Sequence, residues 1–146
     1  LVGGVDAENP MSIPLHILNE WVSEGYIKWE GHSDNMSDKL ASASIICLPS
    51  YREGLPKVLL EAAAIGRALI ATDAPGCREI VKEGYNGILV KMKSVDSLYD
   101  AVITLLDDKE KRSEMGKNSR TLVETELSAT IINTKTIGLY KEILGT

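Results

Sequence analysis

Cysteine is scarce in this sequence, and the usual metal-binding spacings are missing. The only cysteines are Cys47 and Cys77, with no Cys-x-x-Cys pair. Cys47 lies in an apolar run, which favours a buried free thiol over a disulfide or a metal pair. The two histidines, His16 and His32, form no His-Glu-x-x-His motif, and no Asp-x-Asp pair occurs. We therefore expect no dedicated metal site and no metal cofactor.

Several other features that would identify a partner are also lacking. The 12 glycines include no Gly-x-Gly, which excludes the usual dinucleotide and Walker-type phosphate loops. The sequence has 16 basic against 21 acidic residues, and this charge of −5 argues against a nucleic-acid partner. No apolar run approaches the roughly 20 residues of a membrane-spanning helix, and no secretory leader is recognisable. The expected location is the cytoplasm.

What remains is an ordinary globular composition with alternating strand and helix patterns. The 146 residues, 44% hydrophobic, suffice for one domain with a core. β-branched apolar runs predict strands at 26–29, 44–48, 68–71 and 87–90. Helical spacing predicts helices between and after them, at 13–22, 36–41, 56–65, 77–81, 95–106, 109–124 and 129–144. This order predicts an α/β fold, a doubly wound parallel sheet with a C-terminal helical extension.

The beginning of the sequence is unusual. It starts with Leu1-Val2-Gly3-Gly4 rather than with methionine. These residues resemble the end of a buried strand followed by its turn. We therefore expect a fragment whose earlier residues are not included.

The densest chemical signal is the stretch from Leu48 to Ala62, which leads from a buried strand through a polar loop into a helix. In doubly wound sheets, ligands bind at the carboxyl ends of the strands, where this loop lies. Gly54 permits close approach of the backbone, and Pro56 donates no hydrogen bond. The amino end of the helix, around Leu55 to Val58, offers unpaired N–H groups and the positive end of the helix dipole. This arrangement suits a phosphate.

Two carboxylates flank this anion site. Glu53 lies in the loop, and Glu61 lies near the same helix face as Lys57. Carboxylates accept hydrogen bonds from paired sugar hydroxyls, so the combination suits a ligand that carries both phosphates and sugars. The alternative remains open that Glu61 is a solvated partner of Lys57 and that Glu53 is an ordinary loop carboxylate.

These residues resemble a known signature. The segments 53–62, 66–73, 75–81 and 83–90 are similar to the Glu-x7-Glu region of the GT-B glycosyltransferases of family 4. Residues 1–4 and 29–32 resemble strand ends of the same domain. Leu55-Pro56 after Glu53-Gly54 resembles the branch that builds bacterial polysaccharides and lipid-linked glycans.

The resemblance implies a fold, an activity and residue roles. The family has two Rossmann-like domains, of which the C-terminal one binds a nucleotide-sugar donor, here expected to be a UDP-sugar. It transfers a hexosyl or N-acetylhexosaminyl group with retention of configuration and generally needs no metal or other cofactor. Glu53 would be the catalytic-site residue that contacts the donor sugar, and Glu61 would hold the ribose. Gly54, Leu55 and Pro56 would meet the sugar and the diphosphate, and Gly31 and His32 would lie near the base.

The same resemblance shows what this sequence does not include. The family's domain begins with a strand, a Gly-Arg turn and a lysine whose cations contact the diphosphate, and these are absent here. We therefore expect residues 1–106 to form a nucleotide-sugar-binding domain without its first strand and helix, and residues 107–146 to form helices that pack on it. The fragment alone should be inactive, since the acceptor, a glycan or a lipid-linked glycan, would bind the missing N-terminal domain.

Two further expectations concern association, and two alternatives concern function. The last helix is apolar and would cross to the missing domain, so the fragment should expose this surface and self-associate. Peripheral association of the full-length protein with the inner face of the membrane is left open. A sugar-nucleotide epimerase or hydrolase of the same fold, and a non-catalytic binding module, also remain open.

Overall fold

The computed structural model describes residues 1–6, 8–9 and 12–145. Their contacts divide the chain into two compact units, residues 1–36 and residues 37–146. The division that we predict after residue 106 does not coincide with this one and stays a prediction.

The first unit consists of one helix and two extended segments. Helix α1 (Leu15–Ser23) begins after Pro14. Leu1 donates to the Lys28 carbonyl at 2.6 Å, Glu30 donates to the Leu1 carbonyl at 3.1 Å, and Gly3 donates to that of Gly31 at 2.7 Å. The strand predicted at 26–29 is not formed as a regular strand, because so short a pair exchanges few hydrogen bonds. Leu1 and Val2 are exposed, so their predicted burial is also wrong.

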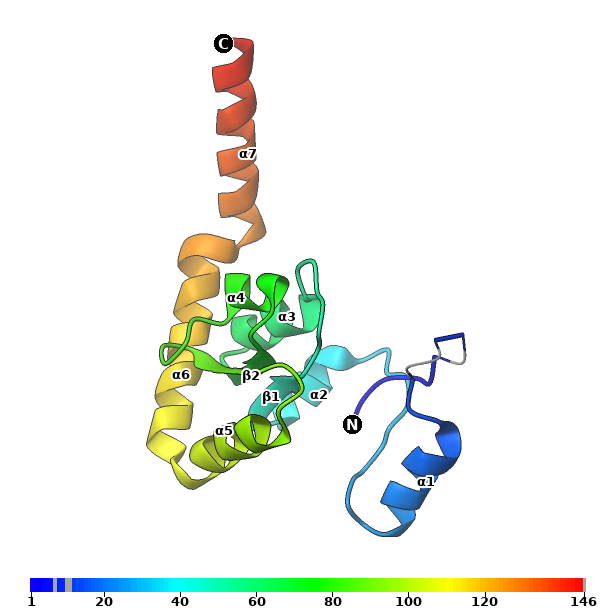
Figure 1. The fold of residues 1–146 in the computed structure, drawn as a ribbon. Coiled ribbons are helices and arrows are strands. Elements are labelled where there is room, and N and C mark those ends of the chain that lie inside the picture. The colour runs from blue at the N-terminus through cyan, green and yellow to red at the C-terminus, as the bar shows by residue number, and fades with distance from the viewer. Residues whose placement is uncertain (7, 10–11, 146) are drawn as a thin grey trace. The chain divides into compact units, whose positions relative to one another are not determined.

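The second unit contains a parallel sheet in the order β1-β2-β3 (Figure 1). Its strands are β1 (Ile45–Leu48), β2 (Ala68–Thr72) and β3 (Gly87–Val90). The helices around it are α2 (Met36–Ser42), α3 (Lys57–Ala64), α4 (Pro75–Ile80) and α5 (Val95–Asp107). This Rossmann-like α/β architecture confirms the predicted fold class.

The core is centred on β2, in which every residue is buried. Ala68 and Ile70 pack in one cluster with Leu105 and Met115. Because side chains alternate across a strand, Leu69 and Ala71 face the opposite side of the sheet. Helix α3 packs against β1 and β2 and also against α4. The sheet is therefore covered on both faces.

The two cysteines differ in their surroundings. Both are free, as predicted, and Cys77 is fully buried. Cys47 is exposed, so its predicted burial is wrong. The reason is that β1 is an edge strand of the three-stranded sheet, whereas the apolar run suggested a strand covered on both sides.

Helix α6 (Lys109–Leu122) packs against β2, α3 and α5. Gly116 lies directly against the turn that ends α3, where a Cβ would come within 2.3 Å of the Gly66 carbonyl oxygen. The Ser119 hydroxyl donates to the Asn86 carbonyl at 3.2 Å. The helix predicted to reach residue 124 ends at Leu122, and a π-helical turn, η1 (Val123–Leu127), follows.

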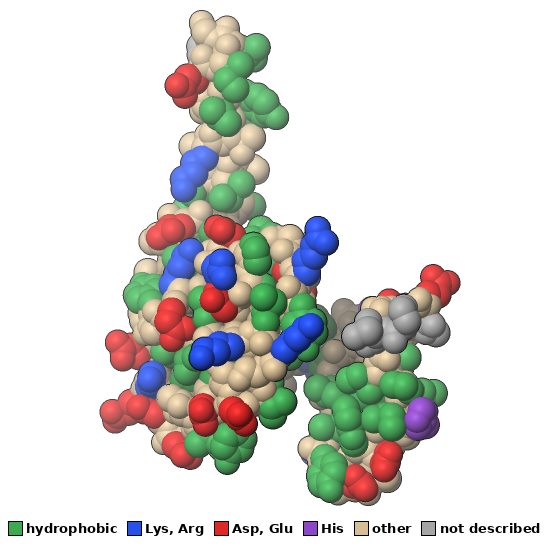
Figure 2. Space-filling model, in the orientation of Figure 1, with side chains coloured by type: hydrophobic (Ala, Val, Ile, Leu, Met, Phe, Trp, Pro, Cys, Tyr) green, Lys and Arg blue, Asp and Glu red, His purple; other side chains and the backbone are tan. Residues whose placement is uncertain are grey.

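The last helix, α7 (Ala129–Leu144), packs against η1 and has no buried residue. Figure 2 shows hydrophobic side chains along it. The side chains of Ile137, Leu139 and Ile143 on this helix are more than half exposed. The expected apolar exposure is therefore found, while self-association stays a prediction. Among the described residues, no helix is long and apolar enough to span a membrane.

Candidate functional site

Three loops meet at the carboxyl edge of the sheet. The parallel register sets Leu48 beside Ala71 and Thr72 beside Val90. The residues that follow β1, β2 and β3 therefore emerge at the same edge, which is where ligands bind in sheets of this type. The loop predicted to carry the chemistry is the first of the three.

This loop ends at the uncapped amino end of α3. Pro56 is buried and occupies the N-cap position, so α3 begins one residue later than predicted, at Lys57, and no side chain caps the helix. Its carbonyl accepts hydrogen bonds from Leu59 at 3.1 Å and from Leu60 at 3.3 Å. The first N–H groups of a helix have no partner inside the helix. With no capping side chain, they remain available to an anion.

Glu53 and Glu61 lie on either side of this helix end along the chain, and their carboxylates have no partner among the described residues. Glu53 is half-buried in the loop, and Glu61 is exposed on α3 about 6 Å along the axis from Lys57. Among the residues that the structure describes, neither carboxylate accepts a hydrogen bond or forms an ion pair. In particular, Lys57 and Glu61 are not paired, although Glu61 is exposed, as the alternative of a solvated carboxylate expects.

Gly76, at the start of α4, holds the Glu53–Gly54 loop in place. A Cβ on Gly76 would lie 2.3 Å from the Gly54 carbonyl oxygen and 2.5 Å from that of Glu53. The next residue, Cys77, lies close enough to Glu53 for the Glu53 carboxylate to affect its thiol. Burial raises the pKa of its thiol, and the Glu53 carboxylate raises that pKa further. This role could not be predicted from the sequence, because the contact joins Gly76 to a loop more than 20 positions away in the chain.

An exposed ion pair occupies the same edge between β2 and α4. The Arg78 guanidinium binds the Asp73 carboxylate and also donates to the Asp73 carbonyl at 3.3 Å. The hydrogen bond from Arg78 lowers the pKa of Asp73, and the Asp73 carboxylate raises the pKa of Arg78. Arg78 is therefore already partnered at this edge.

Gly31 and His32 belong to the first unit. Gly31 has a φ of +66°, and the Nε2 atom of His32 lies 3.3 Å from Oδ1 of Asp34. The structure thus brings five of the predicted site residues into one unit, namely Glu53, Gly54, Leu55, Pro56 and Glu61. Within the described parts of the chain, no group of three or more His, Cys, Asp or Glu residues could hold a metal ion.

A cavity of about 370 Å³ also opens at the carboxyl edge. Tyr51 from the first loop and Lys91 and Lys93 from the third loop line it. Lys93 has a φ of +57°, and its Nζ lies 5.7 Å from the centroid of the Tyr51 ring. None of the five predicted site residues lines this cavity, so it adjoins the predicted site rather than containing it.

Comparison with known families gives a match over most of the chain. Residues 23–122 match the model of the family described as "Glycosyl transferases group 1". Among curated relatives, the chain is 36% identical over 119 residues to the N,N'-diacetylbacillosaminyl-diphospho-undecaprenol alpha-1,3-N-acetylgalactosaminyltransferase of Campylobacter jejuni. That alignment covers 82% of this chain and 30% of the relative. The chain therefore spans less than a third of that relative's length.

Solved structures share the fold. The HepE protein of Anabaena in complex with UDP aligns with a TM-score of 0.86 and 20% identity, over 97% of this chain and 40% of HepE. A sucrose-phosphate synthase from Thermosynechococcus elongatus aligns with a TM-score of 0.83 and 25% identity, over 99% of this chain and 38% of the synthase.

Proposed function

Because this chain belongs to the group 1 glycosyl transferases, we propose that it forms the donor-binding part of a retaining glycosyltransferase. The proposed enzyme moves a hexosyl or N-acetylhexosaminyl group from a UDP-sugar to a glycan or lipid-linked acceptor. One observation carries this proposal: two unpartnered carboxylates, Glu53 and Glu61, flank the uncapped amino end of α3 at the carboxyl edge of the sheet.

The roles follow from the chemistry of each group. The donor's diphosphate lies against the amino end of α3, where the helix dipole and free N–H groups stabilise negative charge. Glu61, one turn into the helix, accepts hydrogen bonds from the ribose hydroxyls. Glu53 accepts hydrogen bonds from the donor sugar, and the exposed backbone of Gly54 and Leu55 contacts the sugar and the diphosphate. Gly31 and His32 are assigned to the base.

The proposed reaction replaces one bond at the anomeric carbon by another on the same face. The bond from that carbon to the diphosphate oxygen breaks, and a bond to the acceptor oxygen forms. The departing phosphate oxygen takes the acceptor's proton, so Glu53 positions the sugar and does not act as a base. Charge develops on the diphosphate as it leaves, and the amino end of α3 stabilises that charge. No metal is required in this scheme.

Two names support the choice of donor and acceptor. The HepE structure contains UDP. The name of the Campylobacter jejuni relative specifies a diphospho-undecaprenol acceptor. An acceptor of this type would place the full-length protein in the cytoplasm at the inner face of the membrane. The acceptor would bind the part of the longer protein that lies outside this chain.

The test is a calorimetric titration of the 146-residue chain with UDP, GDP, ADP and UDP-N-acetylhexosamine. We expect selective binding of the uridine nucleotides. Glu61→Gln should weaken it about tenfold or more, since hydrogen bonds to charged groups contribute roughly 1.5–3 kcal/mol. The matched control is Glu114→Gln, which removes an exposed carboxylate on α6. Equal weakening by both variants would contradict the assignment of Glu61.

We expect this binding to be weak in the isolated chain, because the resemblance assigns the diphosphate-contacting cations to residues outside this sequence. The same titration is therefore repeated on the full-length protein. Absence of nucleotide binding there would overturn the proposed function.

A further inference from the structure

The charges of α6 are segregated between two cavities. Lys109, Arg112, Lys117 and Arg120 all line one cavity, which has a volume of about 610 Å³. Glu110 and Glu114 line a different cavity, together with Lys111. The face of α6 toward the larger cavity is therefore basic, although the whole chain has a net charge of −5.

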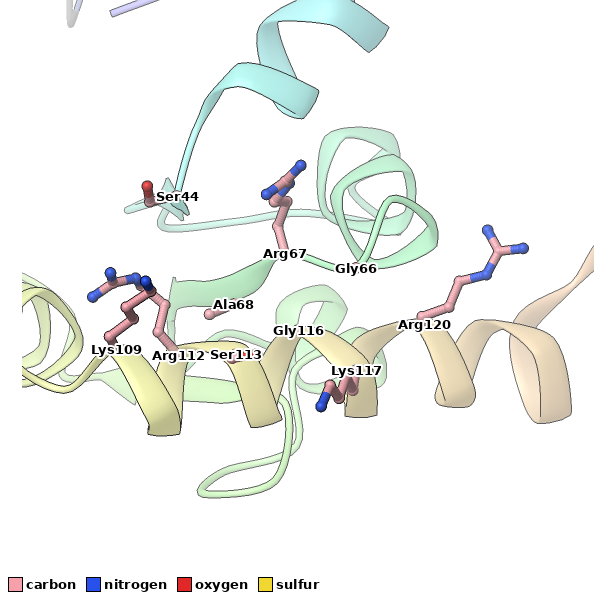
Figure 3. A pocket seen from close by; sticks show the side chains of 10 residues that line it. All are labelled: Ser44, Gly66, Arg67, Ala68, Lys109, Arg112, Ser113, Gly116, Lys117 and Arg120. Carbon is pink, nitrogen blue, oxygen red and sulfur yellow. The ribbon is translucent and has the colours of Figure 1, made fainter.

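The larger cavity lies at the amino edge of the sheet, opposite the candidate donor site. Ser44, just before β1, and Arg67 with Ala68, at the start of β2, complete its lining. Figure 3 shows Lys109 and Arg112 rising from α6 on one side of the hollow, with Arg67 across from them. A strand of four or five residues separates the two edges by roughly 13–17 Å. Five cations and no Asp or Glu line the cavity.

The arginines of this cavity are held in place by helix ends. Each donates to carbonyl oxygens in the last turn of a helix: Arg67 to Ala41 at 2.8 Å, Arg112 to Leu105 and to Leu106 (3.0 Å for the latter), and Arg120 to Ala64. A guanidinium has five N–H donors, so these bonds fix its position and leave other donors available. The cations are thus largely pre-positioned.

The charge of this group is only partly compensated. Arg120 pairs with Glu124 at 2.6 Å. The Nε of Arg67 is buried and has no hydrogen-bond acceptor among the described residues. The ammonium groups of Lys109 and Lys117 form no ion pair or hydrogen bond within the described ranges. Helix capping explains the arginines, but it does not explain the two lysines beside them.

We propose that this cavity binds a phosphate-bearing anion at the amino edge of the sheet, through Arg67, Lys109 and Arg112. The bidentate geometry of fixed guanidinium groups and the free ammonium of Lys109 match phosphate oxygens. The same chemistry is offered by a phospholipid headgroup and by a small soluble phosphate. This site is distinct from the proposed donor site and does not depend on it.

The experiment uses the 146-residue chain and two probes. Inorganic phosphate is titrated while backbone amide signals are followed by NMR, which separates Gly66 and Gly116 of this cavity from Gly54 of the donor site. Vesicles of phosphatidylcholine, with and without phosphatidylglycerol, are used in co-sedimentation. The test variant is Lys109→Gln, whose side chain is exposed. The matched control, Lys111→Gln, removes the same charge from the same helix at the other cavity.

We expect the wild-type chain to bind phosphate or phosphatidylglycerol vesicles. Lys109→Gln should weaken this binding about fivefold, which is the effect of losing one contact between a lysine and a phosphate. Lys111→Gln should leave the binding unchanged. Shifts at Gly66 and Gly116 with free phosphate identify a soluble ligand. Lys109-dependent binding to the vesicles alone identifies a headgroup.

A second variant, Ser113→Glu, places a carboxylate in the cavity without removing a cation and should abolish binding. The proposal would be overturned if Lys111→Gln weakened binding as much as Lys109→Gln, or if the wild-type chain bound neither phosphate nor the vesicles.

Discussion

Substitution of Gly76 by alanine tests how the donor-site loop is held. The new Cβ would lie 2.3 Å from the Gly54 carbonyl oxygen, and an ordinary carbon–oxygen contact needs about 3.3 Å. The loop that carries Glu53 must therefore move by about 1 Å. Overpacking of this kind costs roughly 1–3 kcal/mol, and alanine recovers about 1 kcal/mol as a better helix former than glycine. The net destabilisation is up to about 2 kcal/mol.

Two assays follow this change. Thermal unfolding should show a melting temperature that is lower by up to about 8 °C. In a unit of this size, each kcal/mol of destabilisation lowers the melting temperature by about 4 °C. Nucleotide affinity, measured by calorimetry at a temperature where the variant is folded, should fall about tenfold or more, because Glu53 and the backbone of Gly54 are displaced.

The control is Gly138→Ala, where no atom lies within 4 Å of the new Cβ. It should leave affinity unchanged and should not lower the melting temperature. Wild-type affinity together with an unchanged or raised melting temperature in Gly76→Ala would refute the reasoning.

The remaining predictions concern two polar contacts. Asn86 is fully buried, accepts from the Lys82 amide at 2.7 Å and donates to the Ile80 carbonyl at 2.9 Å. Asn86→Ala should lower the free energy of unfolding in urea by about 2–4 kcal/mol, since it leaves two backbone groups without partners; a loss below about 1 kcal/mol would contradict this role. The hydrogen bond from Arg78 lowers the pKa of Asp73 in the folded state. Their pairing therefore stabilises the fold fully at pH values above the ordinary pKa of aspartate. This stabilisation is lost as the pH falls through the folded-state pKa. Asp73→Asn should therefore flatten the acid limb of melting temperature against pH and converge with wild type at low pH; identical acid limbs would contradict this.

Strands and helices with strong local patterns could be predicted from the sequence. The segment 87–90 and the helix at 129–144 have the predicted bounds, and β1, β2 and α5 differ by one residue at one end. The predicted strand at 26–29 failed because its pairing with residues 1–3, far away in the chain, exchanges few hydrogen bonds. The burial of Cys47 failed for a related reason, since an apolar run does not show whether its strand lies at the edge of a sheet.

The candidate site divides in the same way. The spacing of Glu53, Pro56 and Glu61 could be recognised in the sequence because all three lie on one loop and the helix that follows it. The support of that loop by Gly76 could not, since the contact joins residues more than 20 positions apart. The basic cavity was likewise missed, because mixed charges along α6 resemble a solvated helix face until folding brings Arg67 beside Lys109 and Arg112.

The α/β class, the loop that carries the two glutamates and the family resemblance can be read from the amino-acid order, because they depend on local periodicity and on residues close together in the chain. The folded chain was needed to show that both glutamates lack partners, that Gly76 holds their loop and that cations from α6 and from the residue before β2 line one cavity. Those properties arise from contacts between segments far apart in the chain, and no local pattern records them.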